Sequence, residues 1–407
     1  MKRVWKRSRR EFLRETTALA AIAALGKATA EEVVELPFSN GRRPLVRYPQ
    51  KRPMIRLTTR PPQLETPFSV FDQGVITPND AFFVRYHLTN SPPPESVLRP
   101  ETFRVEIKGS VKSPLRLSLE DLRRFEAVEV VAVNQCSGNS RAFFEPRVSG
   151  GQLGNGAMGN ARWKGTRLKD VLEKAGVAVG ARQVTFDGLD SAPIPKTPDY
   201  VKALDVDHAL DGECLLAYEM NGEELPWLNG YPLRLVVPGY FGTYWVKHAH
   251  QIEVINDVFK GYWMDPAYRI PANDCACVEP GTKPKQTVPI ARLNVRSFIT
   301  SHASGAEVKA QQELTVNGIA FDAGYGIREV LFSADDGKTW RQTTLGADQG
   351  KYSFREWRIS FQLPERGNFV LKVKATNRIG QSQPAGPLWN PAGYMRNVVE
   401  SVQVRAV

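Results

Sequence analysis

The sequence predicts an α+β protein with two folded domains, a mixed α/β domain followed by an immunoglobulin-like β-sandwich. From residue 68 to about 278, short β-branched runs such as VEVVAVNQ and PLRLVVPG alternate with Gly, Pro and a few helical segments, which is typical of an α+β domain. A stretch rich in Pro, Lys and Thr at 279–289 indicates a boundary, and closely spaced strands follow it. The 407 residues, 42% hydrophobic and 24% charged, exclude a disordered or fibrous chain.

The first 30 residues resemble an export signal. Their apolar segment TTALAAIAALG, at 16–26, has 11 residues, whereas a helix that spans a membrane needs about 20. It follows SRREFL at 8–13 and precedes the small-residue pattern ATA at 28–30. Two adjacent arginines before Phe-Leu predict a twin-arginine signal, which exports proteins already folded around a cofactor. An ordinary basic signal peptide is the alternative.

We expect the rest of the chain to form a catalytic domain over 31–285 and the sandwich over 286–407. Residues 31–67 are rich in Pro and Arg and predict an extended arm. The segment RLKDVLEKAG predicts a short helix, because Leu168, Val171 and Leu172 share one face and a Gly follows. After the boundary, LNVRSFI, QQELTVNGIAF, REVLFSAD, WRISFQL and NFVLKVKATN predict strands. The run DDGK at 335–338 predicts a tight turn with a residue at positive φ, followed by Trp340 packed on the sheet.

The net charge argues against a nucleic-acid-binding protein. Eight Lys or Arg and two Glu within 1–30 supply +6 of the formal +11, so the rest of the chain carries only +5. The basic residues form no stripe, and no Gly-rich phosphate loop is present. A mildly basic body is better suited to small anions, and no membrane span is expected after the signal is removed.

Cys136 is the first candidate for chemistry. It ends the β-branched run of VAVNQCSGNSRAFF and begins a loop of Ser, Gly and Asn. Arg141 follows five residues later, and FFVRYHL places Arg85 and His87 on one face if that segment is extended. Two guanidinium groups near one thiolate would lower its pKa and bind a tetrahedral oxyanion. The alternative is a small buried thiol within the core.

Several segments together resemble the sulfite oxidase family of molybdenum enzymes, namely FFVRYHL, NQCSGNSR, ARWKG, FDGLDS, CLLAYEMNGEELPWLNGYPLRLVVPG and WVKH. Their order and spacing agree with the family from about residue 70 to 275, and the later strands agree with its dimerisation domain. The likeness extends to bacterial periplasmic sulfite dehydrogenases through GGQLGNGAMGNARW. It implies one Mo-molybdopterin per chain in a sulfite-oxidase-type domain, with Cys136 as the only protein ligand to molybdenum.

The resemblance also implies the other site residues. Sulfite would be bound beside Cys136 by Arg85 and Arg141, with Tyr268 orienting it or carrying a proton. The cofactor would contact a larger set, made up of Phe83, Val84, Arg85, His87, Cys136, Asp190, Asn229, Arg234, Trp245, Val246 and Lys247.

This sequence departs from the animal enzymes at several positions. Asn229 stands in place of a histidine, and Tyr244 stands in place of an arginine near the pterin phosphate. Leu153 aligns near the tryptophan that lines the animal pocket. Phe259 and Tyr262, in FKGYW, are alternatives to Tyr268.

The remaining cysteines predict no second redox centre. No Cys-x-x-Cys-His motif for covalent haem is present, and nothing before residue 70 resembles a b-type haem domain, so we expect no haem in this chain. Cys275 and Cys277 are too close for the usual zinc spacing and awkward for an unstrained disulfide. We expect them to be structural or weakly redox-active, and Cys214 to be a buried core thiol.

The resemblance implies periplasmic oxidation of sulfite to sulfate, with a c-type cytochrome as electron acceptor or subunit and a possible homodimer through the C-terminal domain. One alternative is a reductase of methionine sulfoxide or another S-oxide from the same superfamily, whose members resemble the catalytic domain alone. Another is a non-catalytic periplasmic binding protein that uses the sandwich. Molybdenum analysis separates the enzymes from the binding protein, and sulfite-dependent reduction of an acceptor separates oxidase from reductase.

Overall fold

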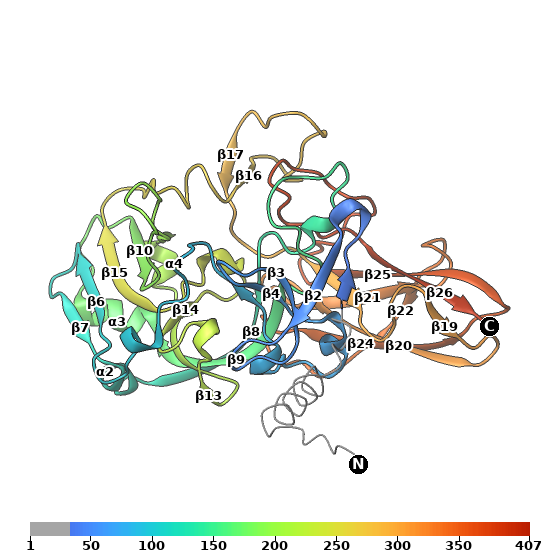
Figure 1. Cartoon of the computed structure of the whole chain (residues 1–407), viewed down its shortest axis with the longest axis horizontal. Helices are drawn as coiled ribbons and strands as arrows, with labels where there is room; N and C mark the ends of the chain where they lie inside the picture. Colours follow the sequence, from blue (N-terminus) through green and yellow to red (C-terminus); the bar gives the residue numbers. More distant parts are fainter. Residues whose placement is uncertain (1–32) are drawn as a thin grey trace, which may run out of the picture.

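The computed structural model describes residues 33–407, so the predicted export signal at 1–30 lies outside the described residues. Figure 1 shows a β-sandwich with the C-terminus at one end of the molecule and the sheets of the first domain at the other. Strands dominate and the α-helices are short, which confirms the α+β class. Within 33–407, no helix is both long and apolar enough to cross a bilayer.

The N-terminal region forms a sheet in the order β1-β2-β3-β4-β5. Its strands are β1 (Val33–Glu35), β2 (Arg42–Val46), β3 (Met54–Thr58), β4 (Gln63–Glu65) and β5 (Val84–Arg85). The described part of the arm predicted over 31–67 is largely extended, and its extended segments pair with one another and so satisfy their backbone donors and acceptors. The pairing of Gln63 with Arg85 joins this region to the predicted site.

Two further sheets build the body of the first domain. One has the order β11-β10-β15-β6-β7, with β11 (Lys202–Asp205), β10 (Gln183–Gly188), β15 (Ala249–Ile255), β6 (Val105–Gly109) and β7 (Leu115–Leu117). The other has the order β13-β12-β9-β8, with β13 (Glu223–Glu224), β12 (Leu215–Met220), β9 (Met158–Arg167) and β8 (Ala127–Gln135), and β14 (Arg234–Val236) pairs with β12. A small hairpin, β16 (Arg269–Pro271) and β17 (Thr287–Pro289), follows.

The predicted helix is confirmed as α3 (Leu168–Ala175), which buries Leu168, Val171 and Leu172 and ends at Gly176 with φ 71°. The helix α2 (Leu119–Arg123) begins with a capping box in which Ser118 and Asp121 exchange hydrogen bonds. A third helix, α4 (Val206–Ala209), is a single turn. Short 3-10 turns shape the connecting loops: η1 (Phe38–Asn40), η2 (Phe68–Asp72), η3 (Asn79–Ala81), η4 (Glu95–Val97), η5 (Arg141–Phe143), η6 (Trp227–Asn229) and η7 (Gly242–Tyr244).

The C-terminal region is a two-sheet sandwich, as predicted. One sheet comprises β18 (Arg296–Ile299), β20 (Glu313–Phe321), β24 (Arg355–Gln362) and β23 (Thr344–Leu345). The other comprises β19 (Ala306–Val308), β26 (Glu400–Ala406), β25 (Gly367–Asn377), β21 (Ile327–Ser333) and β22 (Arg341–Gln342). Side chains such as Val316, Trp357 and Leu371 fill the core between the sheets. The predicted turn is confirmed by positive φ at Asp336 and Gly337.

The two regions share an apolar core at their junction. Phe71 and Tyr268 of the first region pack in one cluster with Phe298, Phe321 and Phe354 of the sandwich. Burial of several aromatic rings is strongly stabilising, so the sandwich is fixed against the side of the first domain that carries Tyr268.

The cysteines differ from expectation at one place. Cys275 and Cys277 form a disulfide, although their spacing argued against it. Ala276 between them has φ 48°, and this turn brings the two Cα atoms to 5.1 Å, within the range that a disulfide bridges. Cys214 is confirmed as a buried free thiol.

Candidate functional site

A pocket in the first domain brings together most of the side chains predicted from the sequence. It has an empty volume of about 650 Å³, its open mouth included. The predicted residues that line it are Phe83, Arg85, His87, Cys136, Asp190, Asn229, Arg234, Trp245, Lys247 and Tyr268. They come from β5 and the residues on either side of it, the loops after β8 and β10, the turn η6, the start of β14, the residues after η7, and the position directly before β16.

Cys136 is the first residue beyond β8. Its N–H donates to the Ala157 carbonyl at 2.9 Å and so continues the pairing of β8 with β9, and its own carbonyl accepts from the Asn139 N–H at 3.0 Å. These bonds fix the backbone while the thiol stays free of any disulfide. Cys136 is 9% exposed and lines the pocket. A strand end that presents an unbonded thiol to a polar cavity is suited to bind a metal ion.

Cationic side chains surround the inner part of the pocket. The Lys247 amine donates to the Arg85 carbonyl at 2.7 Å and lies 4.1 Å from the centre of the Tyr86 ring. The Arg234 guanidinium donates to the Asn229 carbonyl at 2.8 Å and lies over the Trp163 ring. Each cation is thus held by a backbone carbonyl or an aromatic face and keeps further donors for a ligand.

Burial makes this concentration of positive charge costly. It lowers the pKa of Lys247 to about 7, helped by the nearby Arg234, and lowers the pKa of Arg234 to about 9. The Asp190 carboxyl offers partial compensation, but its own pKa is raised, chiefly by burial. An anionic ligand would relieve the mutual repulsion of these cations, so the pocket is built for anions.

His87 and Tyr268 form a second polar group at the pocket. A hydrogen bond joins His87 Nε2 to the Tyr268 hydroxyl, and the His87 ring stacks on Tyr200 at 4.2 Å. Burial and the charges of Arg85, Lys247 and Lys202 hold the pKa of His87 well below its usual value, and burial raises the pKa of Tyr268. Both groups are therefore neutral, and they share a hydrogen bond at the pocket.

Lys202, in β11, is a buried neighbour of this pair that the sequence analysis missed. Its side chain is fully buried, and its amine donates to the Trp263 carbonyl at 2.5 Å. The amine also lies 5.0 Å from the centre of the Tyr268 ring. Burial lowers its pKa to about 7.

The buried amine of Lys202 predicts a pH-dependent stability. Between about pH 7 and 10.5 the unfolded chain holds a proton on Lys202 that the folded protein has lost, so stability rises with pH in this window. Lys202→Met should remove that rise. The free energy of unfolding of the variant minus that of the wild type should therefore be larger at pH 6 than at pH 9, by on the order of 2 kcal/mol. Thermal unfolding at both pH values measures this.

The matched control for this prediction is Lys309→Met, which removes an exposed lysine of the sandwich. Its pH profile should follow that of the wild type. An unchanged profile in Lys202→Met would show that Lys202 does not titrate on unfolding as described.

Arg141 is buried but does not line the pocket. Its Nε donates to the Ala392 carbonyl at 3.1 Å and its Nη1 to the Gly151 carbonyl at 3.1 Å. The guanidinium lies over Gly138, where an added Cβ would be 2.6 Å from Nη2, and 5.1 Å from the centre of the Tyr394 ring. Val84 and Val246 also lie behind the pocket as buried neighbours of Arg85 and Lys247.

The side chains at the positions that depart from the animal enzymes make defined contacts. The amide of Asn229 donates to the Phe83 carbonyl at 3.0 Å and accepts from the buried Lys51 amine at 2.6 Å. The Tyr244 hydroxyl donates to the Ile290 carbonyl at 2.5 Å. Leu153 packs in the core. Tyr268 lines the pocket, whereas the alternatives Phe259 and Tyr262 do not.

The side chains around the site that sequence reasoning missed include Lys51, Tyr200, Lys202 and Tyr394. Tyr394 comes from the C-terminal region and stacks on Tyr268, with ring centres 5.4 Å apart and planes 5° from parallel. No short motif marks these residues, because tertiary packing brings them to the pocket from distant parts of the chain.

The pocket fits the molybdopterin cofactor that the resemblance implies. Three buried polar atoms of lining residues, Asn134 Oδ1, Ser137 Oγ and Arg234 Nε, have no hydrogen-bond partner among the residues that the structure describes. Within residues 33–407, no group of three or more His, Cys, Asp or Glu side chains could enclose a metal ion. The cofactor would supply further ligands to a metal at Cys136, and the buried cations are suited to its phosphate.

Comparison with known proteins places the chain among molybdenum oxidoreductases. Residues 90–263 match the oxidoreductase molybdopterin binding domain, and residues 287–407 match the Mo-co oxidoreductase dimerisation domain. The chain is 33% identical to mitochondrial sulfite oxidase of Mus musculus, over 96% of this chain and 72% of the mouse protein. It is 32% identical to sulfite oxidase of Gallus gallus, over 91% of this chain and 82% of the chicken protein.

Among solved structures, the sulfane dehydrogenase SoxCD from Paracoccus pantotrophus has a TM-score of 0.70 with this chain. The match covers 91% of this chain and 87% of that chain, at 21% identity. At this identity, the likeness shows a shared fold.

Proposed function

The chain belongs to the sulfite oxidase family of molybdenum oxidoreductases, and on this premise we propose that it is a periplasmic sulfite dehydrogenase. In the proposed reaction, sulfite and water give sulfate, two protons and two electrons, and the electrons pass to a c-type cytochrome. One observation carries the proposal. The free thiol of Cys136 lies in a pocket with Arg85, Arg234 and Lys247, so a side chain able to bind a metal stands in a cationic environment.

When bound, the molybdenum cofactor would supply the two-electron oxidant and the oxygen atom transferred to sulfur. Cys136 would hold the metal, while Asn229, Arg234 and Lys247 hold the pterin and its phosphate. Arg85 would bind the oxygens of sulfite, a preorganised interaction that typically contributes a few kcal/mol per donor.

Proton transfer would fall to His87 and Tyr268. Their hydrogen bond at the pocket joins two neutral groups that would orient a water molecule beside the substrate and relay its proton. Tyr200, stacked on His87, would keep the imidazole in this orientation and exclude bulk water from it.

The location and the partners belong to the same proposal. The twin-arginine pattern at 8–13 supports export to the periplasm. The sequence contains no Cys-x-x-Cys-His motif, so electrons would leave for a separate cytochrome, docked transiently or held as a subunit. The match of residues 287–407 to a dimerisation domain supports a homodimer through the sandwich.

Steady-state turnover of sulfite with several acceptors tests the function. Purified protein with about one molybdenum per chain should reduce cytochrome c or ferricyanide in the presence of sulfite and release sulfate. Reduction of methionine sulfoxide without sulfite oxidation would favour the S-oxide reductase instead. Protein that takes up no molybdenum, when made with a functional cofactor supply, would contradict both enzymatic functions.

A further inference from the structure

We propose that a buried ionic cluster of the sandwich, formed by Arg296, Arg396 and Glu400, positions the loop that carries Cys136. None of the three residues lines the pocket, so they are positioning residues. The proposal rests on the proposed function only for its kinetic readout, because the geometry concerns this chain's own loop.

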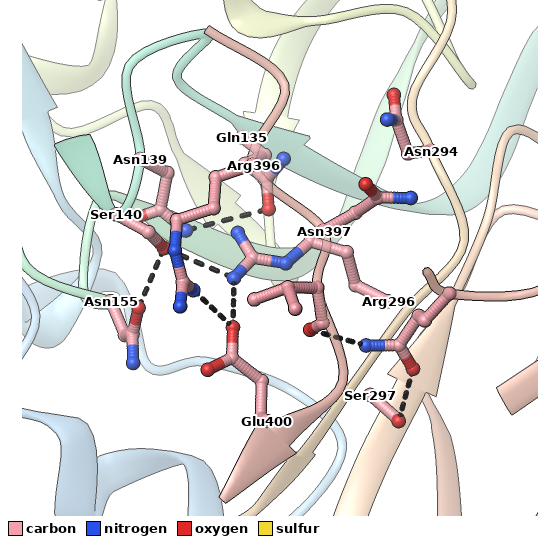
Figure 2. Close-up of polar contacts among 12 residues, drawn as sticks. Gln135, Asn139, Ser140, Asn155, Asn294, Arg296, Ser297, Arg396, Asn397 and Glu400 are labelled. Carbon is pink, nitrogen blue, oxygen red and sulfur yellow. Dashed lines mark hydrogen bonds and ion pairs between the residues drawn. The ribbon is translucent and has the colours of Figure 1, made fainter. Parts of the chain in front are cut away.

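Figure 2 shows Glu400 between two guanidinium groups. Arg296 is 1% exposed, and its Nη2 lies 2.7 Å from Glu400 Oε1. Arg396 Nη1 lies 2.8 Å from the same oxygen. Arg296 begins β18, and Glu400 begins β26, so the cluster ties the two sheets of the sandwich together at the edge that faces the first domain.

The cluster reaches the Cys136 loop through Ser140. Arg296 Nη2 donates to Ser140 Oγ at 3.0 Å, and the Ser140 hydroxyl donates to Asn155 Oδ1 at 2.6 Å, as Figure 2 also shows. Ser140 has φ 69°, a left-handed conformation that is costly for a residue with a Cβ. Contacts on both sides of the hydroxyl therefore hold the loop in a conformation that it would not adopt alone.

The segment that carries Arg396 contacts the same loop at three further points. The Arg396 guanidinium lies 5.1 Å from the centre of the Phe143 ring. The Met395 N–H donates to the Ser137 carbonyl at 3.1 Å, and Arg141 donates to the Ala392 carbonyl. Ser140 and Phe143 flank Arg141, so the sandwich fixes both Arg141 and the residue that follows Cys136.

Stability alone is a poor explanation for such a cluster. Two cations and one anion are taken out of water, and desolvation of buried ion pairs commonly cancels their attraction. Moreover, Arg296 Nε, Arg296 Nη1 and Arg396 Nε have no hydrogen-bond partner within the described chain. Apolar side chains of similar size would stabilise the junction as well, but they would not orient a hydroxyl. A directional hydrogen bond at Ser140 is what the ionic cluster adds.

A double-mutant cycle tests the coupling in the full-length enzyme. Arg296→Met and Ser140→Ala should each lower kcat/KM for sulfite about tenfold, because each removes one hydrogen bond to a charged group. The double variant should lose clearly less than the product of the two single losses, because both changes remove the Arg296–Ser140 hydrogen bond, while the Ser140–Asn155 bond is lost only with Ser140. Molybdenum content should stay at the wild-type level.

Hydrogen exchange gives a readout that does not depend on sulfite. Backbone amides of 137–143 should exchange about tenfold faster in both single variants, while those of β20 and β24 exchange as in the wild type. Arg296→Lys, which keeps the charge and a donor, should restore part of the protection. Arg405→Met is the matched control, because its pair with Glu307 lies on the same sandwich at 3.6 Å but is exposed.

The proposal would be overturned if Arg296→Met and Ser140→Ala lowered kcat/KM by independent factors that multiply in the double variant. It would also be overturned if the amides of 137–143 exchanged at the wild-type rate in both single variants. Ser140→Ala is a small change, so wild-type exchange of 137–143 in this variant overturns the proposal even if Arg296→Met fails to fold. If the wild-type enzyme oxidises no sulfite but the exchange results hold, the proposed substrate is wrong and the positioning role stands.

Discussion

Replacing Cys136 with Ser should abolish sulfite turnover and lower kcat at least about a thousandfold, while the fold remains intact. A hydroxyl is a much weaker ligand than a thiolate for a metal that prefers sulfur. The backbone of residue 136 is held by its own hydrogen bonds to Ala157 and Asn139, which serine retains. The side chain is small, so its exchange for serine leaves no large cavity. Sulfite-dependent acceptor reduction and circular dichroism measure the two parts of this prediction.

The control is Cys214→Ser, the same substitution at the other free cysteine of the described chain. Cys214 lies in the core beside His208, so this variant should lose some stability and keep its turnover. Near-normal sulfite oxidation by Cys136→Ser would refute the assignment of Cys136 as metal ligand.

Replacing Arg85 with Met should raise the KM for sulfite by about 10- to 100-fold, which corresponds to about 1.5–3 kcal/mol for a lost hydrogen bond to a charged group. Methionine has a similar length and preserves the packing of the stem. The Lys247 amine binds the carbonyl of residue 85 rather than its side chain, so the cofactor contacts should survive. Steady-state kinetics at fixed acceptor concentration measures the change.

Arg116→Met removes an exposed arginine that pairs with Glu106 at 3.2 Å, and it should leave the KM unchanged. An unchanged KM in Arg85→Met as well would remove Arg85 from the substrate pocket. A loss of molybdenum from Arg85→Met would instead assign the residue to cofactor binding.

The sequence predicts the part of the site that depends on the spacing of residues within a strand. Arg85 and His87 are two residues apart on an extended segment, and Cys136 ends a β-branched strand, so their presentation follows from strand geometry. Lys247 and Arg234 were found only through the resemblance, because nothing in their local pattern marks them as pocket residues. All five line the same cavity.

The rest depends on long-range packing that no local pattern encodes. In the sequence, Lys202 looks like an ordinary surface lysine at the start of a strand. In the structure, it is fully buried beside Tyr268. Tyr394 arrives from the other domain. Arg141 was expected in the pocket, but the carbonyls of Ala392 and Gly151 hold its guanidinium behind it, and its role in substrate binding stays a prediction.

X-ray absorption at the molybdenum edge tests the central claim most directly, because it counts the sulfur atoms bound to the metal. The wild-type enzyme should show the sulfurs of the cofactor and one more, contributed by Cys136, and Cys136→Ser should show one sulfur fewer with Cys214→Ser unchanged. The same sulfur count in the wild type and in Cys136→Ser would contradict the account, because the metal would then be held without the thiol on which the proposed chemistry depends.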